Sequence, residues 1–129
     1  MQLTDAEWRV MDAVWKKHPA SVREVHEALL EDTGWAYTTV KTMLTRLAEK
    51  GALSLGKDGT VSLFSPLVTR DAAQRTAVST LLSRAFDGTV GGLFQHLLGA
   101  GELGPKERAE IRRLLDESAK AKARPKAKG

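Results

Sequence analysis

The sequence predicts a mainly α-helical protein that carries one β-hairpin near the middle of the chain. Two segments begin with a capping box, in which a hydroxyl residue is followed three positions later by Glu. A third helical segment ends at a glycine, and two alternating segments flank Asp58-Gly59, a strong hairpin signal. Beyond Pro66 the apolar residues return to helical spacing, so a second helical region follows the hairpin.

The first capping box, Thr4-Asp5-Ala6-Glu7, opens a helix that Pro19 brings to an end. Its apolar residues recur every three or four positions, which predicts one buried face on which both tryptophans belong to the core. That face comprises Trp8, Met11, Val14 and Trp15.

The second capping box, Ser21-Val22-Arg23-Glu24, opens another helix, and Asp32-Thr33-Gly34 predicts the turn that follows it. The inward positions of this helix are Val22, Val25, Leu29 and Leu30.

The third helix lies within Trp35–Leu53 and has two different sides, with Gly51 as the residue that closes it. Val40, Met43, Leu44 and Leu47 form an apolar stripe, and the other side carries Thr38, Lys41, Thr42, Thr45 and Arg46. Threonine is a poor choice for an ordinary helix surface, because it loses rotamer freedom against the preceding turn. Thr38 or Thr39 could act as the N-cap, but four threonines on one cationic helix indicate a binding surface.

Residues 52–56 and 60–64 alternate apolar with small or polar side chains, as half-buried strands do, and Lys57-Asp58-Gly59 joins them. Three helices followed by a hairpin give the element order of a winged helix-turn-helix. We expect this domain to span residues 1–68.

Residues 69–117 predict a C-terminal helical domain. Thr69 can cap a helix that runs to about Phe86, residues 89–98 form a short apolar helix, and Pro105 suits a first helical position. The segment is too small to bury its own apolar faces. These faces could cover the N-terminal domain, but association with a second copy is the favoured interpretation. The expected dimerisation residues are Leu81, Leu82, Phe86, Leu93, Phe94, Leu97, Ile111, Leu114 and Leu115.

The net charge of +4 comes from the final segment, because residues 118–129 hold five cations and no acid. We expect this segment to be a disordered basic tail that adds salt-dependent DNA affinity. A more informative balance lies between Trp35 and Lys57, where Lys41, Arg46, Lys50 and Lys57 face a single anion, Glu49.

The sequence also indicates what to exclude. It has no cysteine, and His18, His26 and His96 lack metal-ligand spacing, so we expect no metal and no cofactor. No nucleophile motif or phosphate loop is present, so we expect no enzymatic activity. No apolar run approaches the ~20 residues of a membrane span. The first residues do not resemble a signal peptide, so a cytoplasmic location is expected.

The segments AEWRVMDAVW, VREVHEAL and AYTTVKTMLTRLAEKG resemble the BlaI/MecI family of bacterial transcriptional repressors, which includes the CopY-type copper-responsive repressors. The similarity extends over residues 3–117 and is strongest in the run Tyr37–Leu47. The resemblance implies a homodimer in which an N-terminal winged helix binds a double-stranded, palindromic operator. It places the DNA contacts on Thr38, Thr39, Lys41, Thr42 and Arg46, and the wing around Lys57 and Asp58.

In antibiotic-responsive members of that family, a membrane-embedded metallopeptidase sensor triggers cleavage within the dimerisation domain. The matching bond here is His96–Leu97, where the better-known members have Asn-Phe. Copper sensing through C-terminal cysteines is excluded, because the sequence has none.

On DNA, threonine hydroxyls can bond phosphates or base edges, and threonine methyls can contact the thymine methyl. Lys41 and Arg46 supply charge, and we add Thr45, Tyr37 and Lys57 to the expected contacts. Three alternatives stay open. Arg46 could pair with Glu49, Lys50 could interact with the helix dipole or contact a phosphate, and Tyr37 could pack on the second helix. The alternative function is a winged-helix module that binds proteins and has no specific affinity for DNA.

Overall fold

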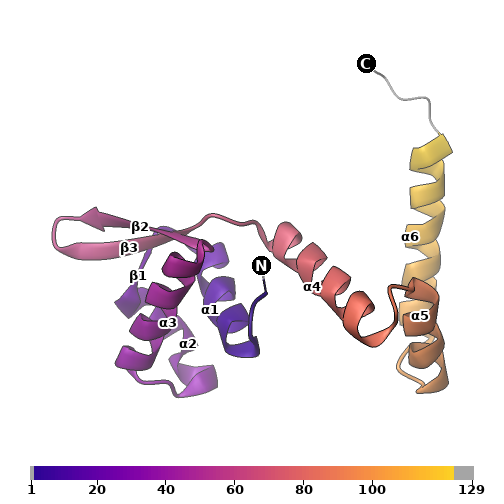
Figure 1. Ribbon diagram of the computed structural model, residues 1–129, viewed down its shortest axis with the longest axis horizontal. Coiled ribbons are helices and arrows are strands. Elements are labelled where there is room, and N and C mark those ends of the chain that lie inside the picture. The colour runs from indigo at the N-terminus through magenta and orange to yellow at the C-terminus, as the bar shows by residue number, and fades with distance from the viewer. Residues whose placement is uncertain (1, 124–129) are drawn as a thin grey trace. The chain divides into compact units, whose positions relative to one another are not determined.

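The computed structural model describes residues 2–123, and the chain divides into two compact units between Leu81 and Leu82. Figure 1 shows the predicted mainly helical architecture with a single hairpin. The elements are α1 (Asp5–Lys16), β1 (Ala20–Ser21), α2 (Val22–Thr33), α3 (Tyr37–Lys50), β2 (Leu53–Asp58), β3 (Val61–Pro66), α4 (Arg70–Ala85), α5 (Val90–Gly99) and α6 (Pro105–Ala123).

Both predicted capping boxes are present at the starts of α1 and α2. The Glu7 amide donates to Thr4 Oγ1 at 3.2 Å, and the Thr4 amide donates to Glu7 Oε1 at 2.9 Å. Ser21 and Glu24 make the same reciprocal pair, at 3.1 and 2.9 Å. Side chains therefore satisfy amide groups that would otherwise be unpaired at both helix starts.

The hairpin of β2 and β3 forms the wing, and it extends beyond α1, α2 and α3 in Figure 1. The register pairs Leu55 with Phe64 and Asp58 with Val61, and the turn between them contains Gly59 at φ 65°. A third strand, β1, pairs with the outer side of β3, so the sheet order is β1-β3-β2. We did not predict β1, because two residues are too few to show a strand period.

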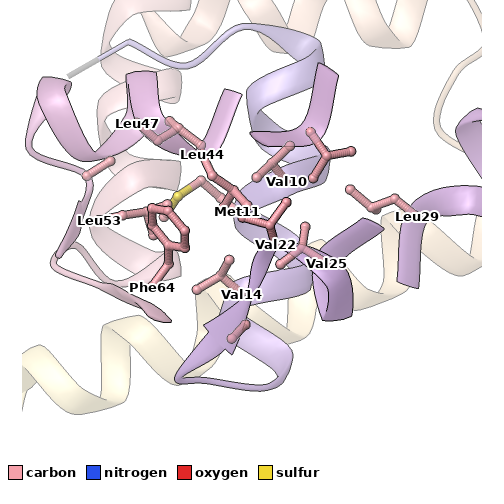
Figure 2. Close-up of a cluster of buried hydrophobic side chains, with 13 residues drawn as sticks. Val10, Met11, Val14, Val22, Val25, Leu29, Leu44, Leu47, Leu53 and Phe64 are labelled. Atoms are coloured by element: carbon pink, nitrogen blue, oxygen red, sulfur yellow. The ribbon is translucent and has the colours of Figure 1, made fainter. Parts of the chain in front are cut away.

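The core of the first unit lies where α1, α2, α3 and the sheet converge (Figure 2). Each helix contributes residues spaced by three or four positions, as the sequence indicated. The main contributors are Val10, Met11 and Val14 from α1, Val22, Val25 and Leu29 from α2, Val40, Leu44 and Leu47 from α3, and Leu53 and Phe64 from the sheet.

Two expectations about this core need correction. Leu30 is 47% exposed, because it is adjacent to the buried Leu29 and points away from the inner face of α2. Trp15 is partly buried and packs against the core as expected, whereas Trp8 is partly buried outside it and contacts Trp15, with ring centroids 5.9 Å apart.

Trp15 also joins the start of α4 to the first unit. Its Nε1–H donates to the carbonyl of Val68 at 2.9 Å, and the Arg70 guanidinium lies 5.0 Å from the centre of its ring. Arg70 also pairs with Asp12, and Thr69 caps α4 by accepting from the Ala72 amide at 3.0 Å. These contacts tie the start of α4 to α1, so the first turns of α4 belong to the first unit.

The second unit contains the end of α4 together with α5 and α6. The turn after α4 is held by hydrogen bonds from the Gly88 amide to the Leu82 carbonyl and from Thr89 Oγ1 to the Phe86 carbonyl. No side chain of α5 is buried, and neither is any described side chain of α6. The predicted tail begins inside α6, since that helix continues to Ala123, and residues 124–129 lie outside the described part of the chain.

Candidate nucleic-acid interface

One face of α3 is fully used by the core, and the opposite face is polar and exposed. Val40, Leu44 and Leu47 are buried with no measurable exposure. All seven expected contacts on this helix are exposed, as are Glu49 and Lys50 near its end: the contacts are Tyr37, Thr38, Thr39, Lys41, Thr42, Thr45 and Arg46. The structure therefore brings seven of the eight predicted contact residues onto one helix.

The threonines of α3 fall into two groups by their hydrogen bonds. Thr42 Oγ1 donates to the Thr38 carbonyl and Thr45 Oγ1 donates to the Lys41 carbonyl, each at 2.9 Å. Among the described residues, the hydroxyls of Thr38 and Thr39 have no such bond. The N-cap of α3 is Ala36, whose side chain cannot accept a hydrogen bond, so neither Thr38 nor Thr39 caps the helix.

The cations on this face are available to a ligand. Within residues 2–123, no ion pair involves Lys41, Arg46 or Lys57. The pair between Arg46 and Glu49, considered as an alternative, does not form. Lys41 and Arg46 therefore present their charge to solvent.

Lys50 has a different role from the other cations. Its Nζ lies 2.8 Å from Glu7 Oε1 and donates to the Gln2 carbonyl at 2.9 Å, so it anchors the C-terminal end of α3 to the start of α1. Burial raises the pKa of Glu7, but the hydrogen bond and charge of Lys50, together with the Thr4 amide, outweigh burial and hold that pKa below its ordinary value. Lys50 therefore helps to fix the position of α3 against α1 and is not one of the cations available to a ligand.

Tyr37 stands at the start of α3, against His26 of α2. The two rings meet edge to face with centroids 5.7 Å apart, and His26 Nε2 donates to the Trp35 carbonyl at 3.1 Å. Tyr37 is still 46% exposed. Packing on α2 and contact with a ligand are therefore compatible roles for Tyr37.

The wing carries the remaining predicted contact, Lys57. This residue is exposed near the end of β2 and lies opposite Ser62 of β3. Cations of the wing and of α3 thus belong to the same folded unit.

A groove of about 490 Å³ lies between α2, α3 and the wing. Its lining residues are Ser21, Val22, Arg23, Tyr37, Lys41, Thr60, Val61 and Ser62. Tyr37 and Lys41 are among the contacts expected from the sequence, whereas Arg23 was expected only as part of a capping box. No local pattern could have placed Arg23 beside the wing, because their proximity depends on the pairing of β1 with β3.

The residues expected for dimerisation are only partly covered by their own chain. Leu82, Phe86, Leu93, Phe94, Leu97 and Ile111 are half-buried, while Leu81, Leu114 and Leu115 are exposed. His96 is exposed and lies edge to face with Phe86, at 6.3 Å between ring centroids. In the described part of the chain, no group of His, Asp and Glu is arranged to hold a metal, and no helix is long and apolar enough to cross a membrane.

Three helices, a wing and an exposed polar face on the third helix define a winged helix-turn-helix of the DNA-binding class. Residues 3–117 match the family model described as penicillinase repressor. The chain belongs to this family of transcriptional repressors, which is the BlaI/MecI family, and the family is not enzymatic.

Individual relatives agree with this assignment. The chain is 31% identical over 116 residues to the penicillinase repressor of Bacillus licheniformis, covering 90% of this chain and 91% of the relative. It is 25% identical over 116 residues to the methicillin resistance regulatory protein MecI of Staphylococcus aureus, covering 90% and 94% of the two chains. The solution structure of the DNA-binding domain of the repressor BlaI superposes with a TM-score of 0.50 at 38% identity, covering 54% of this chain and 84% of that domain.

Proposed function

We propose that the protein represses transcription as a homodimer that occupies a palindromic operator, with α3 of each protomer in the major groove. The observation that carries the proposal is the exposed face of α3 opposite its buried stripe, which presents hydroxyls and two cations that form no ion pair within residues 2–123. A recognition helix needs short side chains so that its backbone can approach the duplex closely. Threonine meets this requirement, and it would be a poor residue for a surface that is always solvated.

The proposed contacts have different roles along the helix. Thr38 and Thr39 lie in the first turn, where free hydroxyls and backbone amides can bond phosphate oxygens. Thr42 and Thr45 come later in the helix and present methyl groups and oxygen lone pairs to base edges. Arg46 can bond guanine in bidentate fashion, and Tyr37, Lys41 and Lys57 add phosphate contacts.

The second unit supplies the dimer contact in this proposal. Its apolar side chains find no complete core within the described chain, and exposed apolar surface of this kind marks an interface. A two-fold dimer presents the same surface twice, which matches an inverted repeat. The two half-sites would lie about one helical turn apart, or ~10 bp between centres.

We also infer that the dimerisation unit can be cut to relieve repression, at the His96–Leu97 bond, after a signal from a membrane metallopeptidase sensor. This bond lies within α5, so the helix must unwind before a protease can bind the segment. Because α5 has no buried side chain, local opening costs little free energy. Mass spectrometry of the repressor after induction would show a fragment ending at His96, whereas an intact chain during full derepression would contradict this part of the proposal.

The central test is the double substitution Lys41→Ala with Arg46→Ala. It should abolish operator shifts while sedimentation still shows a dimer, because both side chains are exposed and neither supports the core. Unchanged operator affinity would remove α3 from the DNA contact.

A protein-binding module is the rival function, and the composition of the α3 face argues against it. The centres of protein–protein interfaces are enriched in aromatic and apolar residues. On this face Tyr37 is the one large apolar side chain, and the others are threonines, cations and a single carboxylate, Glu49. The rival also predicts no salt-dependent affinity for DNA, which the same titrations measure.

A further inference from the structure

The groove between α2, α3 and the wing combines features that suit an anionic polymer. Its lining contains two cations, Arg23 and Lys41, and no carboxylate. Four further lining residues, Ser21, Tyr37, Thr60 and Ser62, carry hydroxyls. Guanidinium, ammonium and hydroxyl groups are the side chains that bond phosphate oxygens in protein–DNA complexes.

The position of the groove identifies which anion would occupy it. Lys41 lines the groove and also belongs to the exposed face of α3, so the two surfaces are continuous. Its other border is the wing, at Thr60, Val61 and Ser62. A strand of duplex DNA that has α3 in its major groove must pass from the helix towards such a border.

We propose that this groove holds the sugar-phosphate backbone of one operator strand, and that Arg23 is a phosphate contact. The inference rests on the proposed function and adds an element, α2, that supplied no contact in it. It keeps the division already proposed for α3, in which Lys41 contacts a phosphate and Arg46 contacts a base. Arg23 then contributes affinity without contributing sequence preference.

Arg23 already has a weak partner that the DNA must replace. Its Nε lies 3.2 Å from Glu27 Oε2, one helical turn away, and the two side chains are 81% and 62% exposed. Exposed pairs of this kind contribute little stability, so a phosphate can displace the carboxylate. Glu27 therefore competes with DNA for Arg23, and its removal should strengthen binding.

The test measures affinity against salt concentration for the full chain, using two duplex probes. One is a duplex selected from a randomised pool by the wild-type protein, and the other is its scrambled version. For Arg23→Ala we expect a loss of about fivefold per half-site at 0.15 M salt on both probes, from a salt slope lowered by about 0.9 for each lost contact. Glu27→Gln should raise affinity on both probes, and the double variant should behave like Arg23→Ala alone.

A matched control is available on α4. Arg75 makes the same kind of pair with Asp71, at 3.1 Å and with side chains 82% and 72% exposed, but it does not line the groove. Arg75→Ala and Asp71→Asn should leave both affinity and salt slope unchanged. Arg23→Lys should restore most of the slope, which a purely structural role for Arg23 would not predict.

The results that would overturn the groove assignment differ from the result that would overturn the proposed function. An unchanged salt slope in Arg23→Ala, with binding still abolished by Lys41→Ala and Arg46→Ala, would overturn the groove assignment and leave the proposed function standing. A loss confined to the selected duplex would show that Arg23 reads a base, which also overturns it. If the α3 double variant bound normally, the proposed function itself would fail.

Discussion

Glu7 makes two interactions that can be separated by substitution. Its carboxylate accepts from the Thr4 amide in the capping box of α1, and it pairs with Lys50 at the end of α3. Glutamine can still accept in a capping box but carries no charge, whereas alanine does neither. Comparing Glu7→Gln with Glu7→Ala therefore separates the cap from the ion pair.

The burial of Glu7 and Lys50 determines how much each substitution should lower the free energy of unfolding. The side chain of Glu7 is only 13% exposed and that of Lys50 is 35% exposed, so their pair is screened less than a surface pair. We expect Glu7→Gln to lower the free energy of unfolding by about 1 kcal/mol, since a charge-assisted bond is lost. Glu7→Ala should cost about 2 kcal/mol, because a net hydrogen bond of about 1 kcal/mol is lost as well.

Tryptophan fluorescence during urea unfolding provides the assay. The chain has three tryptophans, Trp8, Trp15 and Trp35, and all of them lie in the first unit. The signal therefore reports the unit that contains the Glu7–Lys50 pair, whatever happens in the second unit. Urea curves for Glu7→Gln, Lys50→Met and the double variant complete a thermodynamic cycle.

The pH dependence follows from the lowered pKa of Glu7. A carboxylate whose pKa is lower in the folded state stabilises the protein above its ordinary pKa, and this stability is lost as pH falls through the folded value. Wild type should lose more stability on acidification than Glu7→Gln. A coupling free energy below about 0.3 kcal/mol between Glu7 and Lys50, which is within additivity error, would refute the anchor.

Three further substitutions test the dimer contact and the contact of Thr42 with a base. Leu93→Asp should shift the sedimentation of the chain to that of a monomer and weaken operator binding with it; a persistent dimer would place the interface elsewhere. Thr42→Val removes the hydroxyl that bonds the Thr38 carbonyl but keeps a methyl group, so the preference for thymine over deoxyuracil in the operator should survive. Thr42→Ser should lose that preference, worth about 0.8 kcal/mol for one buried methyl group, and equal loss in both variants would contradict a methyl contact.

Local signals in the sequence were sufficient to predict most of the helices and strands of the first unit. The capping boxes of Thr4 and Ser21 and the left-handed Gly51 act within one helical turn, so their effects could be read directly. The same holds for the stripe on α3, because helical spacing decides which side of a helix is buried once the helix forms.

Features that depend on distant parts of the chain could not be predicted. The pairing of Ala20 with Phe64, the hydrogen bond from Trp15 to Val68 and the pair of Lys50 with Glu7 each join residues more than 40 positions apart. For this reason the sequence left Lys50 as a possible phosphate contact and gave no reason to single out Arg23. The dimer contacts remain predictions, because they depend on a second chain.

The two units differ in what they need in order to fold. The first unit has its own buried core, whereas α5 and α6 bury none of their described side chains. If a second copy completes the core of the second unit, folding of that unit and dimerisation become one equilibrium, which responds to the amount of protein present. Dilution would then melt α5 and α6 while the winged helix stays folded. Operator occupancy would rise with the square of the repressor concentration, so a modest fall in its cellular amount would switch the gene on.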